Sequence, residues 1–128
     1  MINKILLLDD NKATNFIHKK FIRMTGCAKE VVSFEIGANA LQYLEDKENS
    51  FPNLIFVDIN MPTMNGWEFF EHFSKIDRVE RESCRSILLT TSLSPNDEDQ
   101  MAEVKAVDEI LIKPLEPNAI GTIVEKYF

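Results

Sequence analysis

Cysteine is scarce in this sequence, whose 128 residues include only two, Cys27 and Cys84. Two cysteines are too few for the disulfide framework of a small secreted domain, and their separation does not match the ligand spacing of a zinc site. Neither has a neighbour in the sequence that would activate it, so we assign no redox role to them. Free thiols are typical of a reducing compartment, and the sequence therefore predicts a cytoplasmic protein.

Long hydrophobic runs are also missing, and so is an excess of positive charge. No segment approaches the roughly 20 apolar residues of a membrane span, and the run Ile5–Leu8 is too short for a signal peptide. The formal net charge is −7, which argues against binding to nucleic acid. Residues 1–30 carry six Lys or Arg against three acids, whereas residues 93–128 carry eight acids against three Lys. We therefore expect the two ends to meet different partners, or different faces of one partner.

Short apolar runs recur along the chain, and longer segments with helical spacing separate them. The length suits one domain, residues 1–128, with no linker or second domain visible. Continuous apolar runs of this length are typical of parallel strands that are buried on both faces. The predicted strands are 4–8, 31–34, 54–57, 86–90 and 109–112. The alternation predicts an α/β domain, in which a five-stranded parallel sheet carries helices on both faces.

Helices are predicted after each strand, and the polar stretch 76–85 is predicted to be an exposed loop. The predicted helices are 12–24, 38–47, 66–75, a fourth from Pro95 and a fifth from Pro117. In the first helix, the predicted apolar face consists of Ala13, Ile17, Phe21 and Met24. Ile22 lies well off this face and is predicted to be exposed. In the third, Phe69, Phe70 and Phe73 are predicted to supply core rings plus one exposed ring.

Polar and charged side chains stand at the ends of four predicted strands. Asp9 and Asp10 follow the first strand, Asp58 ends the third, and Lys113 follows the fifth. Thr90, Thr91 and Ser92 come after the fourth. Sites in open α/β sheets form at the carboxyl ends of the strands, so we expect these groups to meet at one edge.

Clustered carboxylates indicate a bound cation, because their mutual repulsion raises their pKa unless positive charge is supplied. Mg²⁺ prefers oxygen ligands, keeps several waters and often bridges carboxylates to phosphate. Lys113 adds a second positive charge. The combination suits a phosphoryl group on one carboxylate, with the metal and the ammonium neutralising its oxygens.

The same motifs, in this order, resemble the receiver domains of response regulators. The resemblance extends from residue 4 to near the end of the chain, and its motifs together are highly specific. The matching features are Leu8-Asp9-Asp10, Asp58 followed by Met61-Pro62 and Asn65-Gly66, Thr91 with Ser92, and Lys113-Pro114. The resemblance implies the flavodoxin-like (βα)5 fold and a role in two-component signalling. It implies a signalling domain that catalyses only its own phosphorylation and dephosphorylation.

The resemblance assigns a role to each acid at the site. Asp58 would accept the phosphoryl group from a histidine kinase or a histidine phosphotransfer protein. Asp10 and Asp58 would bind Mg²⁺ through their side chains, and Asn60 would bind it through its backbone carbonyl. Asp9 would act largely through a metal-bound water.

A hydroxyl and an ammonium would contact the phosphoryl oxygens in the same family. Thr91 would donate a hydrogen bond to one oxygen, and Lys113 would pair with another. We prefer Thr91 to Thr90 because it lies 22 positions before Lys113, the spacing that the family shows. Thr90 would then point into the core or to the opposite face. A cis bond between Lys113 and Pro114 is expected, since X-Pro bonds adopt cis at low cost.

Two positions depart from the family's pattern. Ile110 stands where the family usually carries an aromatic switch residue, and Leu93 stands where many members carry a polar side chain. His18 could be a phosphorylated or metal-binding histidine, but it has no partner ligand in the sequence. We interpret it as an ordinary residue at the edge of the first helix.

Three other functions remain as alternatives to a phosphorylated switch. A phosphatase with an aspartyl-phosphate intermediate would need a second Asp where Asn60 stands, and an amide cannot donate the proton. A pseudo-receiver that only binds partners would have lost one of the site residues, and none is missing. A flavin-binding domain would need a hydroxyl-rich loop where Asp9 and Asp10 stand. No output module is visible, so we expect a stand-alone receiver that acts through protein contacts or passes its phosphoryl group onward.

Overall fold

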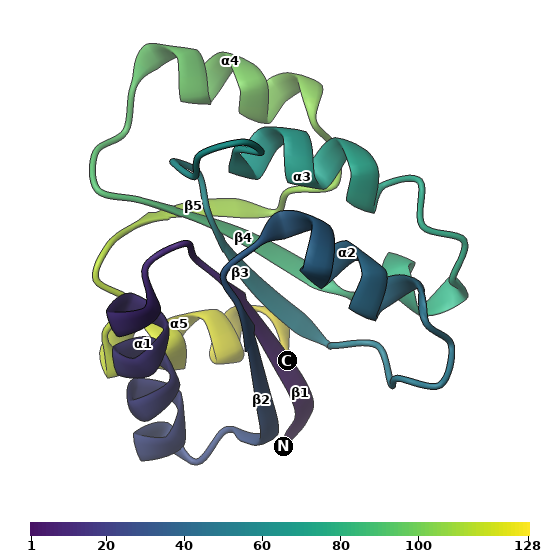
Figure 1. Ribbon diagram of the computed structural model, residues 1–128. Coiled ribbons are helices and arrows are strands. Elements are labelled where there is room, and N and C mark those ends of the chain that lie inside the picture. The colour runs from purple at the N-terminus through teal and green to yellow at the C-terminus, as the bar shows by residue number, and fades with distance from the viewer.

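A five-stranded parallel sheet forms the centre of the molecule (Figure 1). The computed structural model describes residues 1–128. The strand order is β2-β1-β3-β4-β5, and every neighbouring pair is parallel. The strands are β1 (Ile2–Leu8), β2 (Ala28–Phe34), β3 (Leu54–Asp58), β4 (Arg85–Thr90) and β5 (Glu109–Ile112). The predicted fold class is confirmed.

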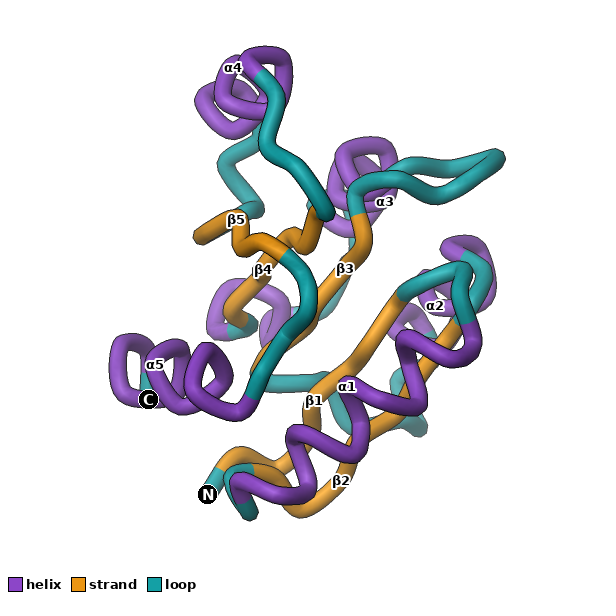
Figure 2. The backbone as a smooth tube through the Cα atoms, turned by 90° about the vertical axis from the view of Figure 1, so that its left-hand side faces the viewer, coloured by secondary structure: helices purple, strands orange, loops and turns teal.

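Helices cover both faces of the sheet, as Figure 2 shows from the side. Helices α1 and α5 lie on one face, and α2, α3 and α4 lie on the other. The helices are α1 (Lys12–Thr25), α2 (Gly37–Glu45), α3 (Gly66–Phe73), α4 (Pro95–Glu103) and α5 (Pro117–Tyr127). None of them is long and apolar enough to cross a membrane. Since β1, β3 and β4 contribute buried side chains to both covered faces, their sequences are largely apolar.

The residues of β1 and β3 alternate between two hydrophobic cores. Leu6 and Val57 face the core under α2, α3 and α4, whereas Ile5 and Phe56 face the core under α1 and α5. Successive side chains of a strand point to opposite faces, which explains this alternation. A third strand of the same kind, β4, completes both cores.

The buried face of α1 differs from the one that the apolar pattern predicts. Ile22 is 1% exposed and packs in the core under α1 and α5, so the prediction that it is exposed is wrong. The buried residues of α1 are Asn15, His18 and Ile22, which follow helical spacing. Two of the three are polar, so counting apolar residues alone selects another face. Ile17 and Met24, which belong to the predicted apolar face, are 41% and 66% exposed instead.

The three phenylalanines of α3 are all buried, and the predicted exposed ring does not exist. Phe69 and Phe70 meet edge to face at 5.3 Å between ring centroids, and Phe70 and Phe73 do so at 5.4 Å. After α3, residues Val79–Ser83 form a short 3-10 helix within the predicted loop. Because α3 lies between α2 and α4, it has neighbours on both sides that bury its rings.

The start of α3 lies directly against Asp58. A Cβ atom at Gly66 would stand 2.8 Å from the carbonyl oxygen of Asp58 and 2.9 Å from the Cα atom of Ile59, so only glycine fits there. The backbone N–H of Gly66 also donates to the carbonyl oxygen of Ile59 at 2.9 Å. Asn65 caps the helix in a capping box with Glu68.

A buried hydrogen bond joins the first turns of α3 and α4. The indole N–H of Trp67 donates to Oδ1 of Asp97 at 3.2 Å. The other carboxylate oxygen of Asp97 accepts from the backbone N–H of Ser94, which completes the capping box at the start of α4. The start of α4 is therefore hydrogen-bonded to α3, the helix whose first residue lies against Asp58.

Candidate functional site

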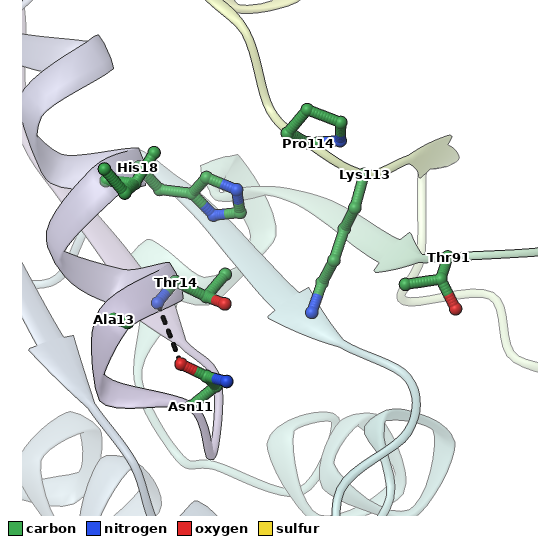
Figure 3. Close-up of a pocket in the computed structure, with 8 residues that line it drawn as sticks. Asn11, Ala13, Thr14, His18, Thr91, Lys113 and Pro114 are labelled. Atoms are coloured by element: carbon green, nitrogen blue, oxygen red, sulfur yellow. Dashed lines mark hydrogen bonds between the residues drawn. The ribbon is translucent and has the colours of Figure 1, made fainter.

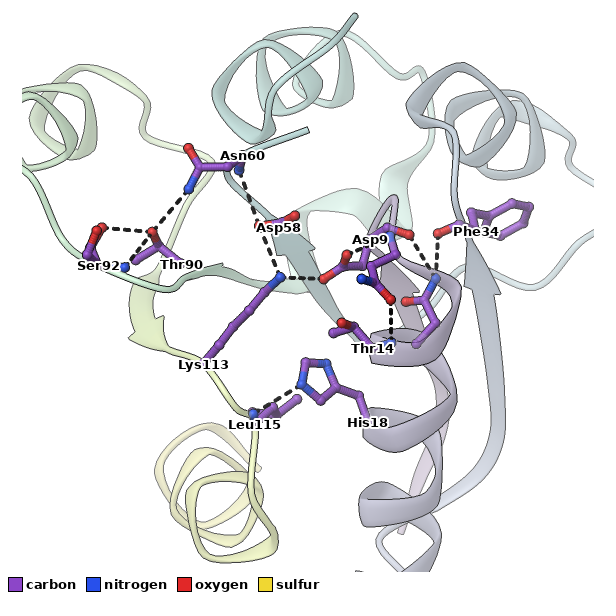
Figure 4. Close-up of polar contacts among 12 residues, drawn as sticks. Asp9, Thr14, His18, Phe34, Asp58, Asn60, Thr90, Ser92, Lys113 and Leu115 are labelled. Atoms are coloured by element: carbon purple, nitrogen blue, oxygen red, sulfur yellow. Dashed lines mark hydrogen bonds and ion pairs between the residues drawn. The ribbon is translucent and has the colours of Figure 1, made fainter. Parts of the chain in front are cut away.

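Three carboxylates converge at the carboxyl end of the sheet, and Figure 4 shows two of them, Asp9 and Asp58. Asp9 follows β1, Asp10 comes next, and Asp58 ends β3. Each offers an oxygen atom within 4.8 Å of the oxygens of the other two. Asp9 and Asp58 are buried, whereas Asp10 is exposed. The structure thus brings together the acids that the sequence places at separate strand ends.

Lys113 reaches into this acidic cluster from the loop after β5. Its Nζ atom lies 2.6 Å from Oδ2 of Asp9 and 3.3 Å from Oδ1 of Asp58. The backbone N–H of Lys113 donates to the carbonyl oxygen of Thr90 at 2.7 Å. The peptide bond between Lys113 and Pro114 is cis, which confirms that prediction.

The charges of the cluster are unbalanced, because one ammonium serves three carboxylates. Burial raises the pKa of Asp58, the charge of Asp9 raises it further, and Lys113 only partly offsets these effects. Burial alone would lower the pKa of Lys113, but the hydrogen bond and charge of Asp9, with those of Asp58, raise it. A cation bound at this edge would relieve the repulsion that remains.

The donor atoms at this edge fit a Mg²⁺ ion. Asp9, Asp10 and Asp58 offer only oxygen, the ligand atom that Mg²⁺ prefers. The backbone carbonyl of Asn60 accepts no hydrogen bond from another backbone amide, so it is available as a further oxygen. The backbone N–H of Asn60 donates to Oδ1 of Asp58 at 3.2 Å and holds this turn against the acid.

Both candidate threonines lie at this edge, in different surroundings. Thr90 is fully buried, as a side chain pointing into the core would be. Its hydroxyl nevertheless accepts a hydrogen bond from the Asn60 side chain at 3.4 Å and donates to the carbonyl oxygen of Ser92 at 2.8 Å. Thr91 is exposed and lines a pocket of about 420 Å³ together with Lys113 (Figure 3). The structure therefore offers a second hydroxyl that residue spacing did not favour.

His18 is buried rather than placed at the helix edge, so that interpretation is wrong. It is 2% exposed, and its Nε2 atom accepts a hydrogen bond from the backbone N–H of Leu115 at 3.2 Å. One turn earlier, the side-chain amide of Asn15 donates to the carbonyl oxygens of Asp9 and Phe34, at 2.9 and 3.1 Å. Helical spacing of Asn15, His18 and Ile22 was the signal that could have revealed this face.

The two positions that depart from the family's pattern lie near the site but outside the acidic cluster. Ile110, in β5, is half-buried and packs against the core under α2, α3 and α4. Leu93 lies in the loop between β4 and α4, with 47% of its surface exposed. About half of this residue is therefore accessible to solvent at this edge.

Comparison with known proteins gives consistent matches over almost the whole chain. A family model described as "Response regulator receiver domain" matches residues 5–125. A hybrid signal transduction histidine kinase, L, of Dictyostelium discoideum is 32% identical over 99% of this chain, which is 7% of that protein. The nitrate/nitrite response regulator protein NarL of Escherichia coli is 32% identical over 88% of this chain and 49% of its own length. The chain thus spans about half or less of these curated relatives.

Solved structures give the same result. The crystal structure of a two-component response regulator from Cytophaga hutchinsonii has a TM-score of 0.85 and 33% identity, and covers 98% of this chain and 96% of that one. The chemotaxis protein CheY4 of Vibrio cholerae has a TM-score of 0.76 over the full length of both chains. Its identity of 22% supports the fold alone.

Proposed function

This chain belongs to the family of response regulator receiver domains, and from that membership we propose that it is a signalling switch phosphorylated on Asp58. The phosphoryl group would come from a histidine kinase or a histidine phosphotransfer protein. The observation that carries the proposal is the position of the Asp58 carboxylate, 3.3 Å from the ammonium of Lys113 and beside Asp9 and Asp10. Metal-supported phosphoryl transfer needs this arrangement of acids and a cation.

In the proposed reaction, a carboxylate oxygen of Asp58 attacks the phosphorus atom of the phosphohistidine. A bond forms between that oxygen and phosphorus, and the bond from phosphorus to the imidazole nitrogen breaks, so the electron pair returns to the imidazole. When bound by Asp9, Asp10, Asp58 and the Asn60 carbonyl, Mg²⁺ would neutralise charge on the phosphoryl oxygens. Neutralisation and positioning supply most of the rate in such transfers.

Lys113 and a threonine hydroxyl would hold the transferred group. The ammonium of Lys113 would pair with one phosphoryl oxygen and give up part of its contact with Asp9. The hydroxyl would bond to a second oxygen, and it is Thr91 by residue spacing or Thr90 by its contact with Asn60. Movement of that hydroxyl would alter the loop before α4, and changed contacts with a protein partner would carry the signal.

The proposal is tested by incubating the protein with acetyl phosphate and Mg²⁺ and measuring its intact mass. We expect one added phosphoryl group, labile to hydroxylamine, in the wild type and none in Asp58→Asn. The matched control is Asp46→Asn, which changes an exposed acid at the end of α2 and is expected to be phosphorylated as the wild type is. Equal modification of Asp58→Asn and the wild type would rule out Asp58 as the acceptor.

A further inference from the structure

A buried histidine of α1 is bonded to the loop that carries Lys113. Nε2 of His18 accepts a hydrogen bond from the backbone N–H of Leu115 at 3.2 Å, a contact that crosses from α1 to the segment between β5 and α5 (Figure 4). His18 is 2% exposed and Leu115 is fully buried, so water does not compete for this bond. A buried N–H group without a partner is unfavourable, which makes the acceptor on His18 important to the loop.

Hydrogen bonds attach the loop after β5 to its surroundings at two residues, Lys113 and Leu115. At the first attachment, the backbone N–H of Lys113 donates to the carbonyl oxygen of Thr90 at 2.7 Å. Two residues later, Leu115 packs in the core under α1 and α5 and donates to His18. The side chain of Lys113 leaves the backbone between these two attachments, and its Nζ atom meets Asp9 at 2.6 Å. The direction of the ammonium therefore depends on how the loop is held.

The chemistry of the imidazole ring agrees with this role. To accept at Nε2, the ring must be neutral and carry its proton on Nδ1. Burial lowers the pKa of His18, and the charge of Lys113 lowers it further, against the opposing effect of Asp9. His18 also lines the pocket of about 420 Å³ beside Lys113 and Thr91 (Figure 3). The ring thus borders the same pocket as the side chain that it is proposed to position.

We propose that His18 is a positioning residue for phosphoryl transfer, because its acceptor nitrogen fixes the loop that aims Lys113 at the phosphoryl group on Asp58. This inference rests on the proposed function. It differs from a purely structural role in one respect. A structural role needs only a side chain that fills the volume of His18, whereas the positioning role needs a hydrogen-bond acceptor at the place of Nε2.

Two amide variants separate these roles. In His18→Gln the side-chain oxygen reaches about as far as Nε2, whereas in His18→Asn the oxygen is too short to meet Leu115. Initial rates of phosphorylation by acetyl phosphate are measured at saturating Mg²⁺, together with Mg²⁺ affinity and the melting temperature. We expect His18→Asn to be phosphorylated at least about tenfold more slowly than wild type, since small misplacements of a reacting group have effects of this size. We expect His18→Gln to stay within about threefold of wild type, and Mg²⁺ affinity to stay within about twofold in both variants.

The control for lost stability is Ile22→Val, a mild truncation of the neighbouring buried residue on the same helix. It is expected to lower the melting temperature and leave the rate unchanged. The inference is overturned if His18→Asn reacts as fast as wild type, if both amide variants are equally slow, or if Ile22→Val slows the reaction as much as His18→Asn does.

Nuclear magnetic resonance tests the same inference without phosphorylation. The ring nitrogen spectrum of His18 should show a proton on Nδ1 only, and the Leu115 amide should exchange slowly in wild type and His18→Gln but rapidly in His18→Asn. The side-chain signals of Lys113 should shift in His18→Asn alone. A proton on Nε2, or Lys113 signals unchanged in His18→Asn, would refute the inference. If wild type accepts no phosphoryl group, the proposed function fails, and these spectra still decide whether His18 positions Lys113.

Discussion

The ammonium of Lys113 lies closer to Asp9 than to Asp58, at 2.6 Å against 3.3 Å. The lysine is therefore held mainly by an acid that the family pattern assigns to the metal, and less by the acid that would be phosphorylated. A phosphoryl group on Asp58 would carry up to about two negative charges in place of the single charge of the carboxylate, and it would compete with Asp9 for the ammonium. Mg²⁺ near Asp9 would weaken the hold of that acid on Lys113. Metal binding and phosphorylation would thus favour the same rearrangement.

Mg²⁺ is expected to stabilise the folded protein before any phosphorylation. At a concentration ten times its dissociation constant, a ligand that binds only the folded state adds about 1.4 kcal/mol, or a few degrees in the melting temperature. The shift should be lost in Asp10→Ala and kept in Glu35→Ala, which removes an exposed acid beside the same loops. Thermal melting with and without Mg²⁺ measures it, and an equal shift in Asp10→Ala would contradict the assignment.

The two threonines can be separated by removing each hydroxyl without changing the shape of the side chain. We expect Thr90→Val to slow phosphorylation by acetyl phosphate about tenfold and Thr91→Val to have a smaller effect. The hydroxyl of Thr90 contacts the side chain of Asn60, two residues from Asp58, so it lies close to the place of the phosphoryl group. Loss of one hydrogen-bond donor to a transition state commonly slows a reaction by this factor or more. A larger loss in Thr91→Val would favour the hydroxyl that residue spacing selects.

Leu93 is expected to prolong the phosphorylated state. The acyl phosphate is lost when water attacks phosphorus in line with the Asp58 oxygen. Leu93 is 47% exposed at this edge and can neither hold nor activate that water, whereas a carboxylate can. Loss of the phosphoryl group should therefore be faster in Leu93→Glu, by about tenfold or more. The decay of phosphorylated protein at constant Mg²⁺ measures this effect, and an unchanged or slower decay would refute it.

The exposed face of α1 is expected to be the docking surface for the phosphodonor protein. Phe16 and Met24 are 69% and 66% exposed. The basic residues Lys20 and Arg23 are exposed on the same helix. Phe16→Glu should slow transfer from the cognate donor at least about tenfold, as loss of an aromatic anchor commonly does, and leave transfer from acetyl phosphate unchanged. Val79→Glu, in the 3-10 helix, is the matched control at 81% exposure. Equal slowing with both donors would indicate a folding defect instead.

Thr63 holds a strained backbone beside the site, with a φ of 68°. A β-branched residue is unfavourable in the left-handed region, where glycine and asparagine are tolerated. We expect Thr63→Asn to stabilise the protein by about 1 kcal/mol, visible as a higher melting temperature. Thr63→Ala keeps a Cβ atom without the polar group of asparagine and should gain less. A lower melting temperature in Thr63→Asn would show that the threonine side chain makes compensating contacts.

The existence of the five strands was predictable because burial on both faces leaves a signal in the sequence, although the polar first half of β2 was not included in the prediction. Leu6, Val57 and Leu88 lie in the central strands, whose residues are mostly buried on both faces and therefore mostly apolar. The acids of the site were predictable for a related reason, since parallel strands bring their carboxyl ends to one edge.

The inner face of α1 was not predictable from apolar residues, because Asn15 and His18 occupy two of its three buried positions. The side-chain N–H group of Asn15 and the Nε2 atom of His18 bond to backbone groups that only the folded chain brings close. The contact between Thr90 and Asn60 was not predicted for a similar reason, since the two residues are 30 positions apart in the chain. Spacing along one segment carries no information about such contacts.

The bond between Trp67 and Asp97 gives the protein an internal optical probe. Trp67 is the only tryptophan in the chain, it is 5% exposed, and it stands where α3, which begins against Asp58, meets the first turn of α4. Indole emission depends on hydrogen bonding and on the polarity of the surroundings. Any loosening of α4 would therefore change the fluorescence of one defined residue, and the conformational state of this edge can be followed in real time without a label.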